Sequence, residues 1–171
     1  MKIFDEIKEI SGKGFEFVSL FGYIIAAFNI SLSISFLLDL PFSLYMFLFF
    51  VFFVFVLNFI FSAITALYID MQTDLSIRTR DFFYFYGITS YLSFLLIPFS
   101  YFYLYKGKGL YLFFIIGFFV WLWRWWFVKK KSSFGIINSI IAVFFPHIII
   151  FVCIFAFVLT ISIISFVYLY G

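Results

Sequence analysis

The most regular feature of the chain is a series of long apolar stretches separated by short polar breaks. An apolar helix of about 18 residues or more, at 1.5 Å per residue, can cross roughly 30 Å of hydrocarbon. Five stretches are this long: Phe17 to Leu38, Ser43 to Tyr68, Phe82 to Tyr105, Leu110 to Val128, and a part of Phe134 to Tyr170. The pattern therefore predicts an all-α fold, a polytopic transmembrane helical bundle with five spans.

The breaks have the composition of loops. They combine charge with Pro, Gly or Ser and lie at 39–41, 70–81, 106–109 and 129–133. The last apolar stretch is too long for one span and too short for two. Pro146 and His147 divide it into a twelve-residue segment and a segment from Ile148 to Tyr170 that can cross the bilayer alone. We therefore expect one final span with a preceding segment at a different angle.

Basic residues predict the orientation, because cytoplasmic loops are enriched in Lys and Arg. With the N-terminus inside, nine basic residues lie on or near the inner side and two, Lys106 and Lys108, lie outside. The inner ones are Lys2, Lys8, Lys13, Arg78, Arg80, Arg124, Lys129, Lys130 and Lys131. This distribution favours an N-in, C-out topology.

Residues 1–16 differ from the rest of the chain and form the first of two predicted units. Ile3, Phe4, Ile7 and Ile10 share one helical face, and charged side chains occupy the remainder. We expect an interfacial amphipathic helix at 1–16 that anchors to the inner leaflet, with docking to a partner as the alternative, followed by the transmembrane helical bundle at 17–171.

Composition supports a membrane protein and excludes several other classes. Hydrophobic residues make up 67% of the chain and charged residues 11%, against about 25% charged in soluble domains. The single Cys153 excludes a disulfide framework and a cysteine metal cluster. A formal net charge of +3 gives no reason to expect nucleic acid as a partner.

The expected chemistry is limited to polar side chains within the spans. We find no nucleophile with a base, no paired-histidine motif and no phosphate-binding or dinucleotide-binding loop, so we expect no enzymatic activity, cofactor or metal. Instead, small and polar residues recur at helical spacing in three spans. They are Gly22, Ala26, Asn29 and Ser33; Asn58, Ser62, Thr65 and Ala66; and Gly135, Asn138, Ser139 and Ala142.

We interpret these residues as polar seams between packed helices, because small side chains allow close approach and amides can hydrogen-bond across the contact. The alternative is a polar cavity for a solute, lined by Asn29, Asn58 and Asn138, so a small-molecule ligand stays open.

Arg124, Pro146 and His147 are predicted to have structural or interfacial roles. Arg124 lies five residues before Lys129, about 7.5 Å along a helix, so we expect it to extend to the inner interface among the Trp residues. His147 is expected to hydrogen-bond the carbonyl freed by Pro146. The alternatives are a functional intramembrane charge for Arg124, and proton relay or ligand binding for His147.

The order of these features over Phe61 to Leu159 resembles the Yip domain family of Rab-interacting membrane proteins, in its bacterial branch. The resemblance rests on Ala63 to Tyr68, on Arg80 to Tyr86 leading to Pro98, on the Trp-ending fourth span and on the Pro-containing last helix. It implies five spans and a cytoplasmic N-terminus. The long N-terminal extension implicated in Rab binding is missing, so the resemblance implies no Rab binding and no functional residue.

We therefore expect a non-enzymatic integral membrane protein that acts through helix packing with itself or with membrane partners in the lipid bilayer. One alternative is a permease-like or solute-binding subunit of a transporter, and another is an accessory subunit of a large respiratory complex. The expected location is the bacterial cytoplasmic membrane, with an organellar membrane as the alternative, because the residue usage suggests an AT-rich genome.

Overall fold

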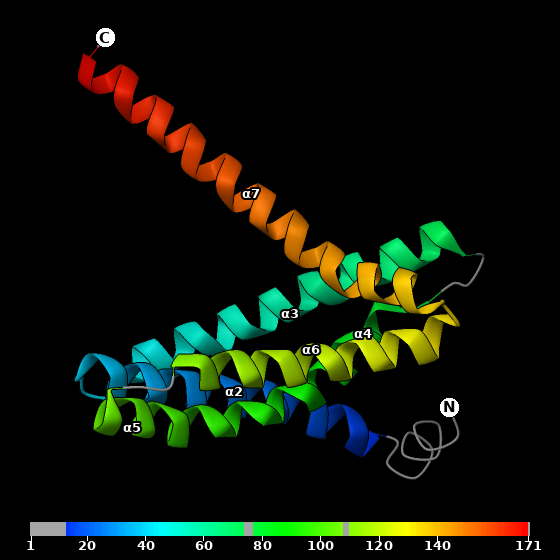
Figure 1. Ribbon diagram of the computed structural model, residues 1–171, viewed down its shortest axis with the longest axis horizontal. Coiled ribbons are helices and arrows are strands. Elements are labelled where there is room, and N and C mark those ends of the chain that lie inside the picture. Colours follow the sequence, from blue (N-terminus) through cyan, green and yellow to red (C-terminus); the bar gives the residue numbers. More distant parts are fainter. Residues whose placement is uncertain (1–12, 74–76, 108–109, 171) are drawn as a thin grey trace.

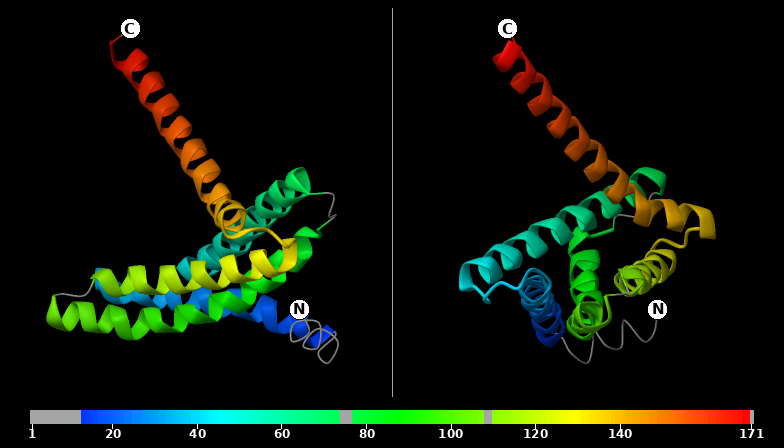
Figure 2. Two further views of the ribbon diagram at one scale, coloured as in Figure 1. Left: turned by 45° about the vertical axis from the view of Figure 1, so that its right-hand side comes forward. Right: turned by 60° about the vertical axis from the view of Figure 1, so that its left-hand side comes forward.

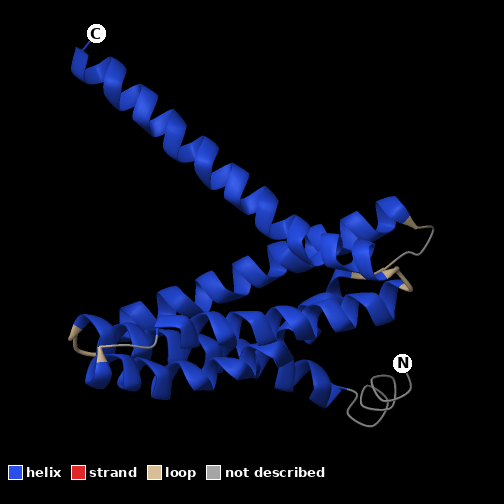
Figure 3. Ribbon diagram, viewed as in Figure 1, coloured by secondary structure: helices blue, strands red, loops and turns tan. Residues whose placement is uncertain are grey.

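The computed structural model describes residues 13–73, 77–107 and 110–170, and nearly all of them are helical (Figure 3). The described part of the chain contains no strand, which confirms the predicted all-α fold. The helices are α2 (Lys13–Leu38), α3 (Leu44–Gln72), α4 (Thr79–Thr89), η1 (Ser90–Leu95), α5 (Leu96–Lys106), α6 (Leu110–Ser132) and α7 (Ile136–Tyr170).

Five of these units are long and apolar enough to cross a membrane, as the sequence predicted. They are Gly14–Leu38, Leu44–Gln72, Thr79–Lys106, Tyr111–Ser132 and Ile136–Ser162, the third consisting of α4, η1 and α5 in succession. Successive spans run in opposite directions (Figure 1). Which side is cytoplasmic stays a prediction.

The proposed boundary at residue 16 does not coincide with a helix end. Residues 13–16 belong to α2 itself, and most of the predicted interfacial helix, 1–12, lies outside the described residues.

Among the described residues, three of the four predicted breaks contain a residue with a left-handed backbone at a helix end, namely Asp39, Gly107 and Ser133, whereas Thr73 after α3 is extended. Asp39, at the end of α2, has a φ of 52°, and Leu40 donates its N–H to the carbonyl of Ser35 at 2.9 Å. Gly107 caps α5 with a φ of 61° and donates to the carbonyl of Tyr103 at 2.8 Å. These hydrogen bonds satisfy carbonyls that the end of a helix leaves without a partner, so α2 and α5 end where the sequence changes character. Helices α3 and α6 continue a few residues into the predicted breaks, to Gln72 and Ser132.

The third span is interrupted at its middle by the 3₁₀ helix η1. The hydroxyls of Thr89 and Ser90 both donate to the carbonyl of Tyr86 at 2.8 Å and compete there with the backbone ladder. Pro98 follows within the first turn of α5, where its missing N–H is tolerated. A tighter i to i+3 segment joins the two helices between these constraints.

Helices α2 and α4 cross with their backbones in direct contact. A Cβ added to Gly87 would fall well inside contact distance of the Ser19 carbonyl oxygen and 2.8 Å from its carbon. A Cβ added to Gly22 would meet the Gly87 carbonyl and lie 2.8 Å from the ring of Tyr91. Only glycine fits at these two positions, and Gly22 is the start of the first predicted seam.

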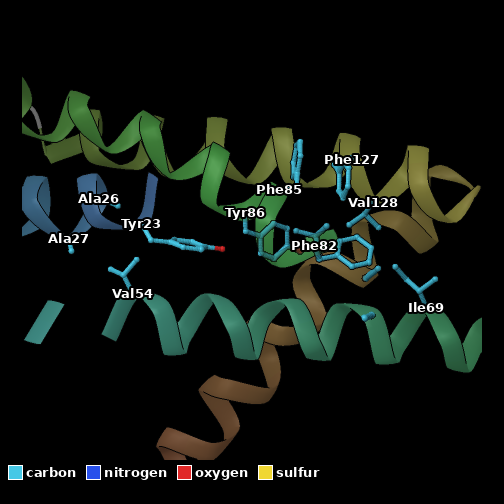
Figure 4. Close-up of a cluster of buried hydrophobic side chains, with 13 residues drawn as sticks. Tyr23, Ala26, Ala27, Val54, Ile69, Phe82, Phe85, Tyr86, Phe127 and Val128 are labelled. Atoms are coloured by element: carbon cyan, nitrogen blue, oxygen red, sulfur yellow. The ribbon is translucent and has the colours of Figure 1, made fainter. Parts of the chain in front are cut away.

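The core lies between α2, α3, α4 and α6 (Figure 4). Phe85 of α4 stacks on Phe127 of α6 with 3.8 Å between ring centroids, and Phe82 meets the same ring edge-on at 5.6 Å. The predicted seams of spans one and two also face this interior: Gly22, Ala26, Asn29 and Ser33, and Asn58, Ser62, Thr65 and Ala66, are all buried. This burial agrees with the packing interpretation of the two stripes.

Helix α7 diverges from the other spans. Its first part packs on α3 and α6, and its remainder points away from the bundle (Figures 1 and 2). It is one continuous helix that contains Pro146, and its initial part runs at an angle to the rest. The prediction of one final span with a differently oriented start is confirmed.

Candidate functional site

The most unusual group in the bundle interior is the guanidinium of Arg124. Helix α6 directs this side chain toward α3 and α4, and only 8% of the residue is exposed. The prediction that Arg124 extends to the inner interface is wrong. Polar groups on two neighbouring helices lie within hydrogen-bonding reach, so the guanidinium is bound within the bundle and does not turn toward Lys129.

Three side chains, those of Asn58, Tyr86 and Thr89, surround the guanidinium. We call these three residues and Arg124 the arginine cluster. Arg124 donates from Nη2 to Oδ1 of Asn58 at 2.6 Å and from Nε to Oγ1 of Thr89 at 3.3 Å. Its Cζ lies 4.1 Å from the centroid of the Tyr86 ring, in a cation–π contact. The cluster thus connects the middle of α3, the end of α4 and the C-terminal half of α6.

A second set of hydrogen bonds supports the partners of Arg124. The amide nitrogen of Asn58 donates to the carbonyl of Val54 at 2.8 Å, which fixes the orientation of its oxygen. The hydroxyls of Tyr86 and Thr65 are 3.2 Å apart. Tyr23 of α2, fully buried, donates to the carbonyl of Phe83 and lies in the same core as Tyr86 (Figure 4). All four of the packed helices therefore contribute to this polar interior.

The cluster holds a positive charge with neutral partners. Withdrawing a charge from water costs several kcal/mol, so each compensating contact matters: about 1.5–3 kcal/mol for a hydrogen bond to a charged group and about 2 kcal/mol for a desolvated cation–π contact. A guanidinium, an amide and hydroxyls can donate and accept hydrogen bonds, but arginine does not release its proton. The arrangement is suited to joining helices and offers no base for proton transfer.

Asn29 and Asn58 do not share a site. Asn29 is buried on α2, and its amide nitrogen donates to Oγ of Ser93 in η1 at 3.1 Å. Each of the two amides is therefore a link between helices, which agrees with the packing interpretation of the seams.

Asn138 contradicts the predicted grouping because it is exposed on the first turn of α7, as is Gly135 just before the helix. Only Ser139 and Ala142 of the third stripe are buried. Helix α7 presents to α6 the face that carries Ser139, whose hydroxyl accepts a hydrogen bond from Nε1 of Trp125 at 2.9 Å. Asn138, one residue earlier, points elsewhere, so a cavity lined by Asn29, Asn58 and Asn138 does not form.

His147 and Pro146 lie where α7 leaves the bundle. Pro146 is fully buried, and the imidazole of His147 stacks on Phe61 of α3 with 4.5 Å between centroids. Nδ1 of His147 lies 2.9 Å from the carbonyl oxygen of Val143. The predicted partner was the carbonyl freed by Pro146, which in a helix is the carbonyl of Ala142. His147 contacts the carbonyl of Val143, four residues before itself, so the predicted partner is wrong.

Sequence reasoning missed Tyr23, Thr65 as a partner of Tyr86, and Thr89. A signal was present in the two tyrosines, because a phenol in the middle of an apolar span needs a hydrogen-bond partner. Thr89 gave no such signal, since a threonine in a helix can bond to its own backbone.

The two amides differ in the charge of their partner, and this difference predicts different effects. Replacing Asn29 by Ala removes one neutral hydrogen bond, for which membrane proteins average about 0.6 kcal/mol and seldom exceed 1.7. We expect Asn29→Ala to lower the melting temperature of the detergent-solubilised protein only slightly and to leave it folded. A loss of folded protein would show that the contact with Ser93 has been undervalued.

Comparison of the chain with models of protein families, with curated protein sequences and with solved structures gives no match.

Proposed function

We propose that this chain is a non-enzymatic integral membrane protein that works by helix packing, with a second copy of itself or another membrane protein as its partner. The observation that carries the proposal is the exposure of α7. Every residue from Phe151 to Ser162 is exposed. At 1.5 Å per residue, the segment from Ile148 to Tyr170 is about 35 Å long, enough to cross a bilayer without contact with its own bundle.

One face of this segment has the residues that membrane helices use to pack closely. Cys153, Ala156 and Thr160 follow at steps of three and four, and all three are exposed. Small side chains at such spacing let two helix backbones approach closely. The resulting van der Waals packing drives the association of membrane helices, because lipid tails are as apolar as the side chains and the hydrophobic effect gives no preference for protein over lipid. The opposite face carries Phe155 and is bulky.

The arginine cluster supports a packing role over the alternatives. Its polar groups bind one another across α3, α4 and α6. A solute-binding subunit of a transporter would need such groups directed at a shared space, and Asn29, Asn58 and Asn138 are directed to three different surroundings. An accessory subunit of a larger membrane complex is one form that the proposed packing role can take.

The family, orientation and membrane of this protein belong to the same proposal. The resemblance to the Yip domain family is supported by the order of the spans, by Pro98 in the third span and by Pro146 in the last. The N-in, C-out orientation is supported by the basic residues, and the bacterial cytoplasmic membrane, with an organellar membrane as the alternative, by residue usage.

A photo-crosslinker on α7 tests the proposed packing. We expect p-benzoylphenylalanine at Phe157, which flanks the face of Cys153 and Ala156, to give a discrete protein adduct on irradiation of intact membranes. The same crosslinker at Phe155, on the opposite face, is the matched control and should react mainly with lipid. Gel mobility and mass spectrometry of the adduct distinguish a second copy from another protein.

Absence of a protein adduct at both positions would contradict the proposal. Protein adducts of equal yield at Phe155 and Phe157 would show that α7 contacts other proteins without a preferred face, and this result would also contradict the proposal.

A further inference from the structure

Two apolar hollows lie side by side on the outer surface of the bundle. The first, of about 430 Å³, lies against α6 and the second, of about 460 Å³, against the start of α2. Leu92 of η1 and Trp123 of α6 line both, so we treat the hollows as one two-lobed groove. The remaining lining residues are Phe119, Leu122, Trp125 and Trp126 in the first lobe, and Phe15, Val18, Ile88, Tyr91 and Phe94 in the second.

The walls of the groove are almost wholly apolar, and several of them are exposed. Phe119 is 53% exposed, Trp123 44% and Trp126 47%. In a membrane such a surface contacts hydrocarbon. A concave surface contacts an acyl chain on several sides, whereas a single helix face contacts the chain on one side only. Two lobes that join at Leu92 and Trp123 match a lipid with two acyl chains.

The position of the groove along α6 corresponds to one leaflet. Lys130 follows Trp123 by seven residues and Phe119 by eleven, which is about 10 Å and 17 Å along a helix. Half of the hydrocarbon core is roughly 15 Å thick. The groove therefore extends from just below the lysines at the end of α6 to near the middle of the bilayer.

The mouth of the groove carries positive charge. Two helical turns separate Trp123 from Lys130, so the exposed Lys130 lies on the same face of α6 as the groove. Nζ of Lys129 lies 5.5 Å from the ring centroid of Trp125. Among the described residues, the acidic groups at the starts of α2 and α4 have basic partners: Glu16 pairs with Arg80, and Asp81 with Lys131 at 3.0 Å. Lys129 and Lys130 thus leave an excess of positive charge where a headgroup would sit.

We propose that the two-lobed groove binds one anionic phospholipid, with an acyl chain in each lobe and the headgroup phosphate at Lys129 and Lys130. Basic residues beside a groove between membrane helices are the arrangement that recognises acidic headgroups, and apolar walls retain the chains. This inference requires a membrane location but is independent of the packing role of α7.

The tryptophans provide a direct probe of this site. All four, Trp121, Trp123, Trp125 and Trp126, lie on α6, and all except Trp121 line the groove. The full-length protein reconstituted with dibrominated phosphatidylglycerol should show stronger fluorescence quenching than with dibrominated phosphatidylcholine. The ratio of the two gives the preference for the anionic lipid.

Substitution of the two lysines tests the headgroup contact. Each basic residue near a headgroup contributes about fivefold, so Lys129→Gln with Lys130→Gln should reduce the preference by roughly 25-fold. The matched control is Lys106→Gln with Lys108→Gln, which removes the same formal charge beginning at the last residue of α5 and should leave the preference unchanged. An unchanged preference in the first pair, or equal losses in both, would overturn the proposal.

Single-tryptophan proteins test the location. With the other three tryptophans replaced by Phe, a protein that retains Trp123 should keep the headgroup preference, and one that retains Trp121, which packs 5.0 Å from Phe144 of α7, should lack it. Equal behaviour of the two would show that the lipids form an ordinary annulus, and the groove would not be a site.

Discussion

Gly87→Ala should severely destabilise the bundle. The added methyl group would meet the backbone of Ser19, which cannot rotate aside as a side chain can, so α2 and α4 must separate to admit it. Overpacking of a close contact costs about 1–3 kcal/mol, and we expect the upper end or more because backbone meets backbone. The measurement is the free energy of unfolding in mixed detergent micelles, with helicity followed by circular dichroism.

Gly117→Ala is the matched control for this substitution. Gly117 lies within α6, and a Cβ there would meet no heavy atom within 4 Å. Since Ala is the better helix former, the control should be neutral or slightly stabilising. Gly22→Ala should resemble Gly87→Ala, and the double variant should be less damaging than the sum, because both methyl groups force the same crossing apart. If Gly87→Ala were as stable as Gly117→Ala, the α2–α4 crossing described above would be wrong.

The second large effect is expected at Asn58. Asn58→Ala removes the acceptor that lies 2.6 Å from the Arg124 guanidinium and leaves a buried charge with one partner fewer. The expected loss is about 2–4 kcal/mol, because removal of one partner from a buried charge is far more damaging than loss of a neutral hydrogen bond. Asn29→Ala, with its neutral partner Ser93, supplies the comparison and should cost several times less.

Removing the charge as well should restore much of the stability. In the double variant Asn58→Ala, Arg124→Met, the arginine cluster no longer holds a charge, and apolar replacements of buried ionic groups are often neutral or stabilising. We therefore expect the double variant to be more stable than Asn58→Ala alone. A double variant less stable than either single one would show that Arg124 and Asn58 contribute independently, contrary to the geometry of the cluster.

The number and length of the spans could be predicted from sequence because the bilayer imposes them. A lipid-exposed backbone must satisfy its own hydrogen bonds, so each long apolar stretch becomes a helix, and Asp39 or Gly107 marks its end. The stripes that include Gly22 and Ser62 were also readable, because small residues at helical spacing belong to one face whatever that face contacts.

What the local pattern could not supply is the rotation of one helix relative to another. The contact between Asn58 and Arg124 joins residues 66 positions apart, and no periodicity within either span indicates it. The same limit explains Asn138: its stripe was correctly spaced, but α7 packs through Ser139 and Ala142 and turns Asn138 outward. The 3₁₀ segment of the third span could not be predicted, because it depends on two hydroxyls that bond to the Tyr86 carbonyl. The residue pattern does not indicate which acceptor these hydroxyls use.

The buried Arg124 has a consequence for the order in which the chain enters the membrane. An arginine opposes insertion of an isolated span by about 2.5–3.5 kcal/mol when it lies at the centre, and by less toward an end, where Arg124 lies. Its partners, Asn58, Tyr86 and Thr89, all belong to segments that precede α6 in the chain and are therefore synthesised first. The second and third spans can thus bind the guanidinium when the fourth span enters the membrane. Insertion in order from the N-terminus therefore lowers the free-energy cost of inserting Arg124, which would be higher if α6 entered the lipid alone.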